Sequence, residues 1–255
     1  MKPLVALVLT TSLAAVAGIA FAQLKMGAAP AAPAAASDAV LRAAVLKAIP
    51  GVKIESVNPS VIPGYREVAI SGKVVYVSVD GKYLMQGSLV ELSTRDNLTA
   101  ASEGVLRRGT LNAVGPERRI VFGPANPKHR VTVFTDIDCG YCRKLHSEMA
   151  DFNKAGIAIE YLFFPRAGVG SESFQDAVSV WCSADRRKAL TDAKAGKPTP
   201  KKTCANPVAE DYELGRRIGV DGTPAIYAAD GTQIGGYLSP QDMLQRLDRI
   251  AAKAR

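Results

Sequence analysis

The stretch VFTDIDCGYC, residues 133–142, joins an apolar run to two cysteines three positions apart. Together with the residues before it, the run reads HRVTVFTD (129–136), a pattern typical of a buried strand. The residues that follow, YCRKLHSEMADFNKAG (141–156), predict a helix that ends at Gly156. Cys139 therefore stands where a strand gives way to a helix.

This position predicts a reactive thiol. Backbone N–H groups and the positive end of the helix dipole point at the Cys139 sulfur and favour its thiolate. A cysteine in such a place commonly has its pKa lowered from about 8.5 to roughly 3.5–7.5. Cys142 lies nearly one turn further on, close enough to attack a mixed disulfide on Cys139. Gly140 and Tyr141, between the cysteines, set the turn and the redox potential of the pair.

Two other interpretations of the pair compete with redox activity. As a permanent staple, the pair closes too short a loop to stabilise the fold much. As a zinc site with His146 or the distant cysteines, it lacks the second C-x-x-C or H-x3-H half. The sequence therefore favours a redox-active pair, with no metal and no cofactor.

The other two cysteines, Cys182 and Cys204, flank the segment AGKPTPKKT (195–203). An even number of cysteines in an exported chain favours disulfides. Closing this loop contributes roughly 3 kcal/mol in the chain-entropy model. We expect a structural disulfide here, with a second redox relay as the alternative.

The amino terminus has the pattern of a secretory signal peptide. Lys2 precedes an apolar core, and small residues at Ala20 and Ala22 place the cut after Ala22. An uncleaved membrane anchor is the competing interpretation. Residues 23–37 are rich in alanine and proline and predict a disordered leader.

Residues 38–95 predict a small α+β domain. A helix over 38–51, capped by Ser37 or Asp38 and stopped by Pro50-Gly51, precedes three β-rich runs. Asp80-Gly81 is a strong hairpin signal. So small a unit leaves strand edges that need a cover, and self-association is one way to provide it.

The rest of the chain predicts a linker and a second domain. Residues 96–125 have helical composition up to the stop at Gly115-Pro116. In residues 126–255, strand, helix, strand, helices, a hairpin at Asp230-Gly231 and a last helix describe an α/β layer sandwich.

The net charge of +8 comes partly from paired basic residues. Acidic residues are interspersed and aromatic residues are scarce around the pairs, so we interpret them as solvated faces and exclude nucleic acid as a partner. They are Arg107-Arg108, Arg118-Arg119, Arg186-Arg187-Lys188 and Lys201-Lys202.

Two further features are weaker signals. His146 lies one turn after Cys142 and is either a proton relay or, as more often, a partly buried surface residue. Thr223-Pro224 opens a strand-like run and is a candidate cis peptide, although few X-Pro bonds are cis.

Several segments together resemble one family, the DsbC/DsbG family of periplasmic disulfide isomerases in the thioredoxin superfamily. The resemblance runs from about residue 40 to the end. The DsbG branch carries proline after its first cysteine, so Gly140 favours the DsbC branch. The segments are VFTDIDCGYCRKLHSEM (133–149), YLFFPRAG (161–168), VWCSADRRKAL (180–190) and AEDYELGRRIGVDGTPAI (209–226).

The resemblance implies a thioredoxin-like catalytic domain with inserted helices, preceded by an α+β dimerisation domain and a helical linker, in a V-shaped homodimer. It implies that Cys139 attacks, that Cys142 resolves and that Cys182 pairs with Cys204. It also implies that the Thr223-Pro224 loop binds substrate backbone beside Gly140 and Tyr141. One departure is Val133, where many thioredoxin-like proteins keep a buried carboxylate; Asp136 or Asp138 is the alternative acid.

The activity so implied is the rearrangement of wrong disulfides in exported proteins, in the periplasm and with possible chaperone activity. The membrane reductase DsbD is the implied electron donor, and DsbA is the source of the errors. The alternatives are a general reductase or oxidase, a sulfenic acid reductase like DsbG, and a non-enzymatic holdase.

Overall fold

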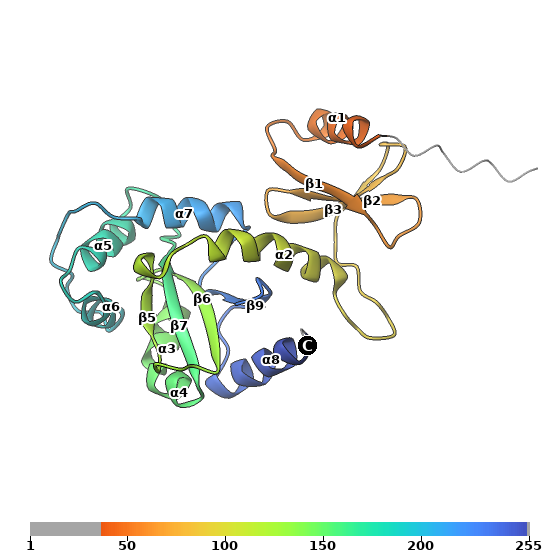
Figure 1. Ribbon diagram of the computed structural model, residues 1–255. Coiled ribbons are helices and arrows are strands. Elements are labelled where there is room, and N and C mark those ends of the chain that lie inside the picture. The colour runs from red at the N-terminus through yellow and green to blue at the C-terminus, as the bar shows by residue number, and fades with distance from the viewer. Residues whose placement is uncertain (1–36, 254–255) are drawn as a thin grey trace, which may run out of the picture. The chain divides into compact units, whose positions relative to one another are not determined.

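The structure is a computed structural model that describes residues 37–253 (Figure 1). The expected signal peptide and all but the last residue of the expected leader lie outside the described residues. Two sheets organise the described chain, one of four strands and one of five. Among residues 37–253, none of the helices combines the length and apolar character that a bilayer crossing requires.

The first sheet is antiparallel throughout, in the order β1-β2-β3-β4, and carries one helix. The helix α1 is capped by Ser37, whose hydroxyl accepts from the Val40 N–H at 3.4 Å. Leu41 and Val45 of α1 are buried against β2 and β3, as the amphipathic pattern predicts. The elements are α1 (Asp38–Ala48), β1 (Ile54–Pro59), β2 (Tyr65–Ile70), β3 (Lys73–Ser78) and β4 (Leu84–Met85).

Two short turns join β2 to β3 and β3 to β4. The predicted turn at Asp80-Gly81 is confirmed, because β3 pairs antiparallel with β4 beyond it, although β4 has only two residues. A second turn, between β2 and β3, was missed by sequence reasoning. Ser71 and Gly72 have φ angles of 49° and 76°, the pair of positive values that a tight two-residue hairpin needs.

The predicted helix that follows is confirmed as α2 (Leu98–Asn112). The Asn97 side chain caps it by accepting from the Ala100 N–H at 2.9 Å. After a short 3-10 turn, η1 (Pro116–Arg118), the chain forms β5 (Ile120–Phe122), which pairs antiparallel with β7. The sequence analysis predicts no strand in the linker expected over 96–125, because a strand so short shows no period in the sequence.

The second sheet has the order β5-β7-β6-β8-β9, in which only β6 and β7 are parallel. The predicted helix over 141–156 is two helices that meet at Glu148. The predicted hairpin is confirmed as β8 and β9. The remaining elements are β6 (His129–Thr135), α3 (Gly140–Ser147), α4 (Met149–Lys154), β7 (Ile157–Phe163), α5 (Glu172–Trp181), α6 (Arg186–Lys194), α7 (Val208–Arg217), β8 (Ala225–Ala228), β9 (Gln233–Gly235) and α8 (Pro240–Lys253).

Helices cover both faces of this sheet (Figure 1). Successive side chains of a strand point to opposite faces, so Val133 and Phe134 of β6 belong to different cores. Val133 packs with residues of α3, α4, α5, α6 and α8, whereas Phe134 packs with residues of α2 and α7. Burial on both faces explains why β6 and β7 read as continuous apolar runs.

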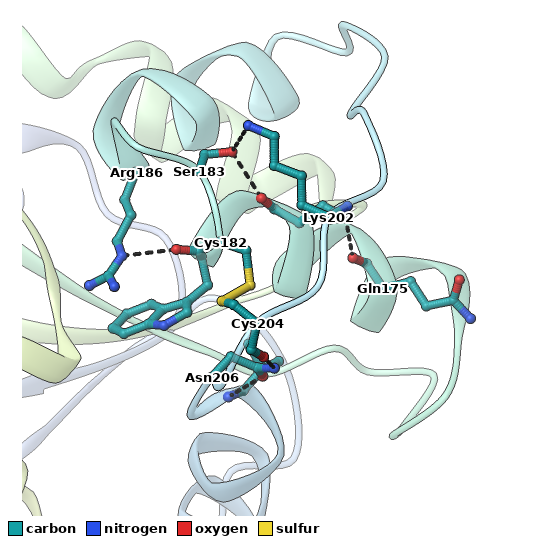
Figure 2. Close-up of a disulfide and its surroundings, with 10 residues drawn as sticks. Gln175, Cys182, Ser183, Arg186, Lys202, Cys204 and Asn206 are labelled. Atoms are coloured by element: carbon teal, nitrogen blue, oxygen red, sulfur yellow. Dashed lines mark hydrogen bonds between the residues drawn. A yellow bond between two sulfur atoms is a disulfide. The ribbon is translucent and has the colours of Figure 1, made fainter.

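The predicted disulfide between Cys182 and Cys204 is present, with an S–S distance of 2.00 Å (Figure 2). Cys182 follows the end of α5, and Cys204 follows the extended segment that returns from α6. Hydrogen bonds also hold this segment, from the Lys202 N–H to the Ser179 hydroxyl at 3.1 Å and from Lys202 Nζ to the Ser183 hydroxyl at 3.2 Å. The disulfide therefore fixes a segment that has no helix or strand of its own.

We expect a Cys182→Ala/Cys204→Ala variant to lose about 3 kcal/mol of unfolding free energy, because the bond closes a loop with a sequence separation of 22. The measurement is urea unfolding in a Cys139→Ser/Cys142→Ser background, which keeps the other thiols from exchanging. Equal unfolding midpoints with and without the disulfide would contradict a structural role for the bond.

Candidate active site

The strand pairing of the second sheet brings three loops together at one end of its central strands. In β6 and β7, which run parallel, Thr135 pairs with Phe163, so the residues after both strands leave the sheet at the same end. In the antiparallel neighbour β8, Ala225 pairs with Phe134, so Thr223 and Pro224 enter at that end too. The Thr223-Pro224 peptide bond is cis, as expected.

Cys139 is the cap residue of α3 and lies among these loops. Its sulfur accepts from the Cys142 N–H at 3.3 Å and lies 3.1 Å from the Thr223 carbonyl oxygen, to which the thiol donates. Both cysteines are free thiols and are buried, with 3% of Cys139 and 1% of Cys142 exposed. The structure thus brings Cys139, Cys142 and Thr223 together, as the sequence predicts.

Opposing effects set the pKa of Cys139. Burial raises it, whereas hydrogen bonding with Thr223 and Cys142 and the charge of Arg166 lower it, and the net pKa lies below the usual value. Within α3, the Cys142 N–H donates to the sulfur and so favours the thiolate. The expected activation of Cys139 by the start of α3 thus has a geometric basis.

Cys142 has the opposite bias. Burial raises its pKa above the usual value, and the charge of Lys194 and the Thr135 side chain oppose this only in part. One thiol is therefore the better attacking group, and its neighbour stays protonated until it is needed. Thiol-disulfide exchange requires such a division, because the thiolate is the attacking form.

The two acids considered in place of a carboxylate at Val133 have other contacts. Asp136 is buried and accepts from the Arg166 backbone N–H and from Arg166 Nε, each at 2.9 Å, and from the Asp138 N–H at 2.8 Å. Asp138 is exposed and pairs with Arg143 at 3.3 Å. Asp136 therefore holds the loop before Cys139, and Asp138 lies at the surface.

Sequence reasoning missed Lys194, the last residue of α6. Its ammonium donates to the Thr135 hydroxyl at 2.7 Å and to the Asp136 carbonyl at 2.9 Å, and burial lowers its pKa to about 8. Lysine rarely lies inside a protein, so the residue type gave no signal. The helical spacing did, because Lys194 follows the buried Leu190 by four residues and lies on the same face of α6.

His146 is buried rather than partly exposed at the surface. One ring nitrogen lies 3.2 Å from the Tyr161 hydroxyl and the other 2.9 Å from the Thr191 hydroxyl. Burial, with a smaller effect of the Lys194 charge, lowers its pKa to about 4. His146 is therefore neutral near pH 7, and both of its nitrogens are engaged away from the cysteines.

Gly140 and Tyr141, expected to contact substrate, form the exposed part of the site. Tyr141 is 65% exposed and stacks on Tyr237 with ring centroids 6.1 Å apart. The Tyr237 hydroxyl in turn donates to Glu148 at 2.7 Å, which ties the aromatic pair to the junction of α3 and α4. Within residues 37–253, no three His, Cys, Asp or Glu side chains gather as a metal site would require.

The site combines the Cys139 thiol, whose pKa is lowered, with the buried thiol of Cys142, at the end of the central strand of a sheet of this order. This combination defines a class of protein, the thioredoxin-like thiol:disulfide oxidoreductases. Comparison with known proteins agrees with this class. Residues 120–251 match the family model of a thioredoxin-like domain, and residues 30–100 match that of the disulfide bond isomerase protein N-terminal domain.

Curated relatives identify the family. The chain is 38% identical to the thiol:disulfide interchange protein DsbC of Escherichia coli K12 and 40% identical to that of Salmonella typhimurium, in each case over 84% of this chain and 88% of the relative. A crystal structure of a disulfide interchange protein from Neisseria gonorrhoeae is 30% identical, covers 52% of this chain and 97% of that one, and has a TM-score of 0.46. The chain belongs to the DsbC family of thiol:disulfide interchange proteins.

We expect the Cys139 thiol to titrate below the value of about 8.5 for a free cysteine. The measurement is the pH dependence of alkylation by iodoacetamide, with Cys139 identified by peptide mass. Arg166→Met is expected to move the inflection upward, because the arginine charge favours the thiolate. Lys154→Met, at the far end of α4, is the control and leaves the inflection in place. An inflection at the free-cysteine value would contradict the activation of Cys139.

We expect His146 to make the protein less stable in acid. Its folded pKa of about 4 lies below the unfolded value of about 6.5, so the unfolded chain binds the extra proton between these values. Its contribution is complete above about pH 6.5 and is lost as the pH falls to about 4, in total roughly 3 kcal/mol.

The measurement is urea unfolding as a function of pH. His146→Gln is expected to flatten the acid slope, whatever its effect on stability at neutral pH, whereas Ser147→Ala, an exposed neighbour, keeps the slope. An unchanged slope in His146→Gln would show that His146 is not the group responsible.

Proposed function

We propose that this chain is a periplasmic protein disulfide isomerase in which Cys139 attacks wrong disulfides and Cys142 resolves the intermediate. The observation that carries the proposal is the Cys139 sulfur itself, which accepts the Cys142 amide at 3.3 Å and faces the Thr223 carbonyl at 3.1 Å. The family supports the reaction type, because its members are named thiol:disulfide interchange proteins.

The reaction begins when the Cys139 thiolate attacks one sulfur of a substrate disulfide. That disulfide breaks, a mixed disulfide forms with Cys139, and the second substrate sulfur leaves as a thiolate. In isomerisation this thiolate, or another on the substrate, attacks elsewhere until a substrate thiolate displaces Cys139. No net oxidation or reduction occurs, so Cys139 must start and end reduced.

The second outcome is reduction. Cys142 attacks Cys139, the bond to the substrate breaks, and the substrate leaves with two thiols while Cys139 and Cys142 form a disulfide. The pair has then given two electrons to the substrate and must be reduced again. We propose the membrane reductase DsbD as the donor and the errors made by DsbA as the source of substrate.

The loop at Thr223-Pro224 is proposed to hold substrate backbone. Its position opposite the end of β6 places it beside Cys139, and the Thr223 hydroxyl is buried without a partner among the described residues. Tyr141 and Gly140 complete the surface, since both are exposed at the start of α3. A substrate segment lying here would present its sulfur to Cys139.

We assign residues 38–95 to dimerisation, 96–125 to a linker that includes α2, and 126–255 to catalysis. Within the linker range, β5 pairs with β7 of the catalytic sheet. Support for a homodimer comes from the segment after the Asp80-Gly81 turn. Its large apolar side chains are exposed in the single chain, as expected of a surface that a second copy covers. They are Tyr83, Leu84, Met85, Val90 and Leu92. The signal peptide proposed for residues 1–22 directs the chain to the periplasm.

The proposal predicts that the chain restores activity to scrambled ribonuclease and that Cys139→Ala abolishes this rescue. Cys142→Ala is the matched variant: it retains the first attack and is expected to accumulate mixed disulfides, visible by non-reducing electrophoresis. Full rescue by Cys139→Ala would instead indicate a non-enzymatic holdase.

Gel filtration of the same preparation tests the assembly. A dimer that rescues the substrate is expected. A monomer that oxidises or reduces dithiols without rescuing the substrate would indicate a general reductase or oxidase. Reduction of a protein sulfenic acid without rescue would indicate a sulfenic acid reductase like DsbG.

A further inference from the structure

Lys194 is a buried cation without a carboxylate partner. Only 4% of the residue is exposed, and its ammonium donates to two neutral oxygens, the Thr135 hydroxyl and the Asp136 carbonyl. Across residues 37–253, no acidic side chain lies within ion-pair distance of it. A buried charge is costly unless an opposite charge compensates it. The structure must therefore supply the compensating negative charge from another kind of group.

The cysteines supply that charge when they are ionised. Burial favours the neutral amine of Lys194, and the charge that most strongly opposes this effect is that of Cys142, followed by Cys139. In Cys142 burial favours the thiol, and the charge of Lys194 is the largest effect that opposes it. Each of the two buried groups thus gains most from the charged form of the other.

The surroundings leave this pairing intact. From α3, Arg143 and His146 face Lys194 along with the cysteines, and Asp136 faces it from the loop after β6. Asp136 is engaged by Arg166, and His146 is neutral near pH 7. The neighbouring strand β5 has no titratable side chain, and α5 carries Glu172 and Asp176, neither of which pairs with Lys194.

We propose that Lys194 is a positioning residue for the resolving step: its ammonium, fixed by Thr135 and the Asp136 backbone, stabilises the thiolate that Cys142 forms to attack the mixed disulfide. The inference rests on the function proposed above for Cys142. In this step the Cys142 sulfur bonds to Cys139, the bond from Cys139 to the substrate breaks, and the substrate sulfur leaves and takes a proton. The cysteine pair is oxidised and the substrate is reduced.

The test uses the full chain and the disulfide reagent dithiobis(nitrobenzoate). The attack of Cys139 releases one coloured thiolate, and the attack of Cys142 on the resulting mixed disulfide releases a second, so the two steps appear as two phases in stopped flow. Lys194→Met removes the charge, Lys194→Gln removes the charge but keeps hydrogen-bond donors, and Lys197→Met, at an exposed lysine just after α6, is the control.

We expect both Lys194 variants to slow the second phase and to shift its pH–rate inflection upward. Each unit of rise in the pKa of Cys142 lowers its thiolate fraction at neutral pH about tenfold. A more basic thiolate is also a better nucleophile, and this offsets about half of the loss in thiolate fraction on a logarithmic scale. The net slowing is about threefold for each unit of rise in the pKa of Cys142. The slowing is expected to vanish at alkaline pH, where Cys142 ionises without help, and Lys197→Met is expected to match the wild type.

A second phase with the wild-type pH profile in either folded Lys194 variant would overturn the inference. A wild-type chain that shows no second phase would overturn the proposed role of Cys142 instead, so the two failures are distinguishable. If neither variant folds, titration of the Lys194 side chain by NMR decides. Because the coupling is reciprocal, its pKa is expected to fall in Cys142→Ser, and an unchanged value overturns the inference.

Discussion

The pairing of β6 with its two neighbours is the constraint on which the site depends. The Phe164 N–H donates to the Thr135 carbonyl at 2.8 Å and closes the ladder where β6 ends. On the other side, Phe134 pairs with Ala225. A shift of one residue in either register would turn Thr135 or Pro224 to the opposite face of the sheet. The position of Cys139 relative to Thr223 is thus set by backbone hydrogen bonds rather than by contacts between flexible side chains.

Within this frame, two buried thiols are given opposite properties. Cys139 caps the start of α3. The first N–H groups of a helix have no carbonyl partner within the helix, and one of them, that of Cys142, points at the Cys139 sulfur. Cys142 lies inside the helix, where its own N–H is the donor of that bond and where burial has the largest effect on the pKa of its sulfur. The difference follows from position in α3 and not from residue type. An acidic attacking thiol and a reluctant second thiol therefore arise from one short segment.

The sequence predicted the features that are encoded by neighbouring residues and missed those that depend on distant ones. Cys139, Cys142 and the helix after them are neighbours in the sequence, so their spacing predicted the reactive pair, whereas the even number of cysteines in an exported chain and the family resemblance predicted the disulfide between Cys182 and Cys204. The break at Glu148, the strand β5 and the hairpin at Ser71-Gly72 were missed, because each is decided by tertiary contacts or by too few residues to show a period. The burial of His146 has no local signal in the sequence, because its partners, Tyr161 and Thr191, come from β7 and α6.

The role proposed for Lys194 places a charge beside the cysteines without an acid at Val133. Val133 is fully buried among apolar side chains of the larger core, where a carboxylate would lose its hydration. The charge instead reaches the cysteines from α6, a helix about fifty residues further along the chain, which no local pattern near the cysteines encodes. A carboxylate at position 133 and the ammonium of Lys194 differ in their chemistry. A carboxylate removes the proton of the resolving thiol, whereas an ammonium stabilises the thiolate that remains. An ammonium near both sulfurs also stabilises the reduced pair relative to its disulfide. It therefore favours the redox state in which Cys139 is free to attack, and that is the state that isomerisation requires.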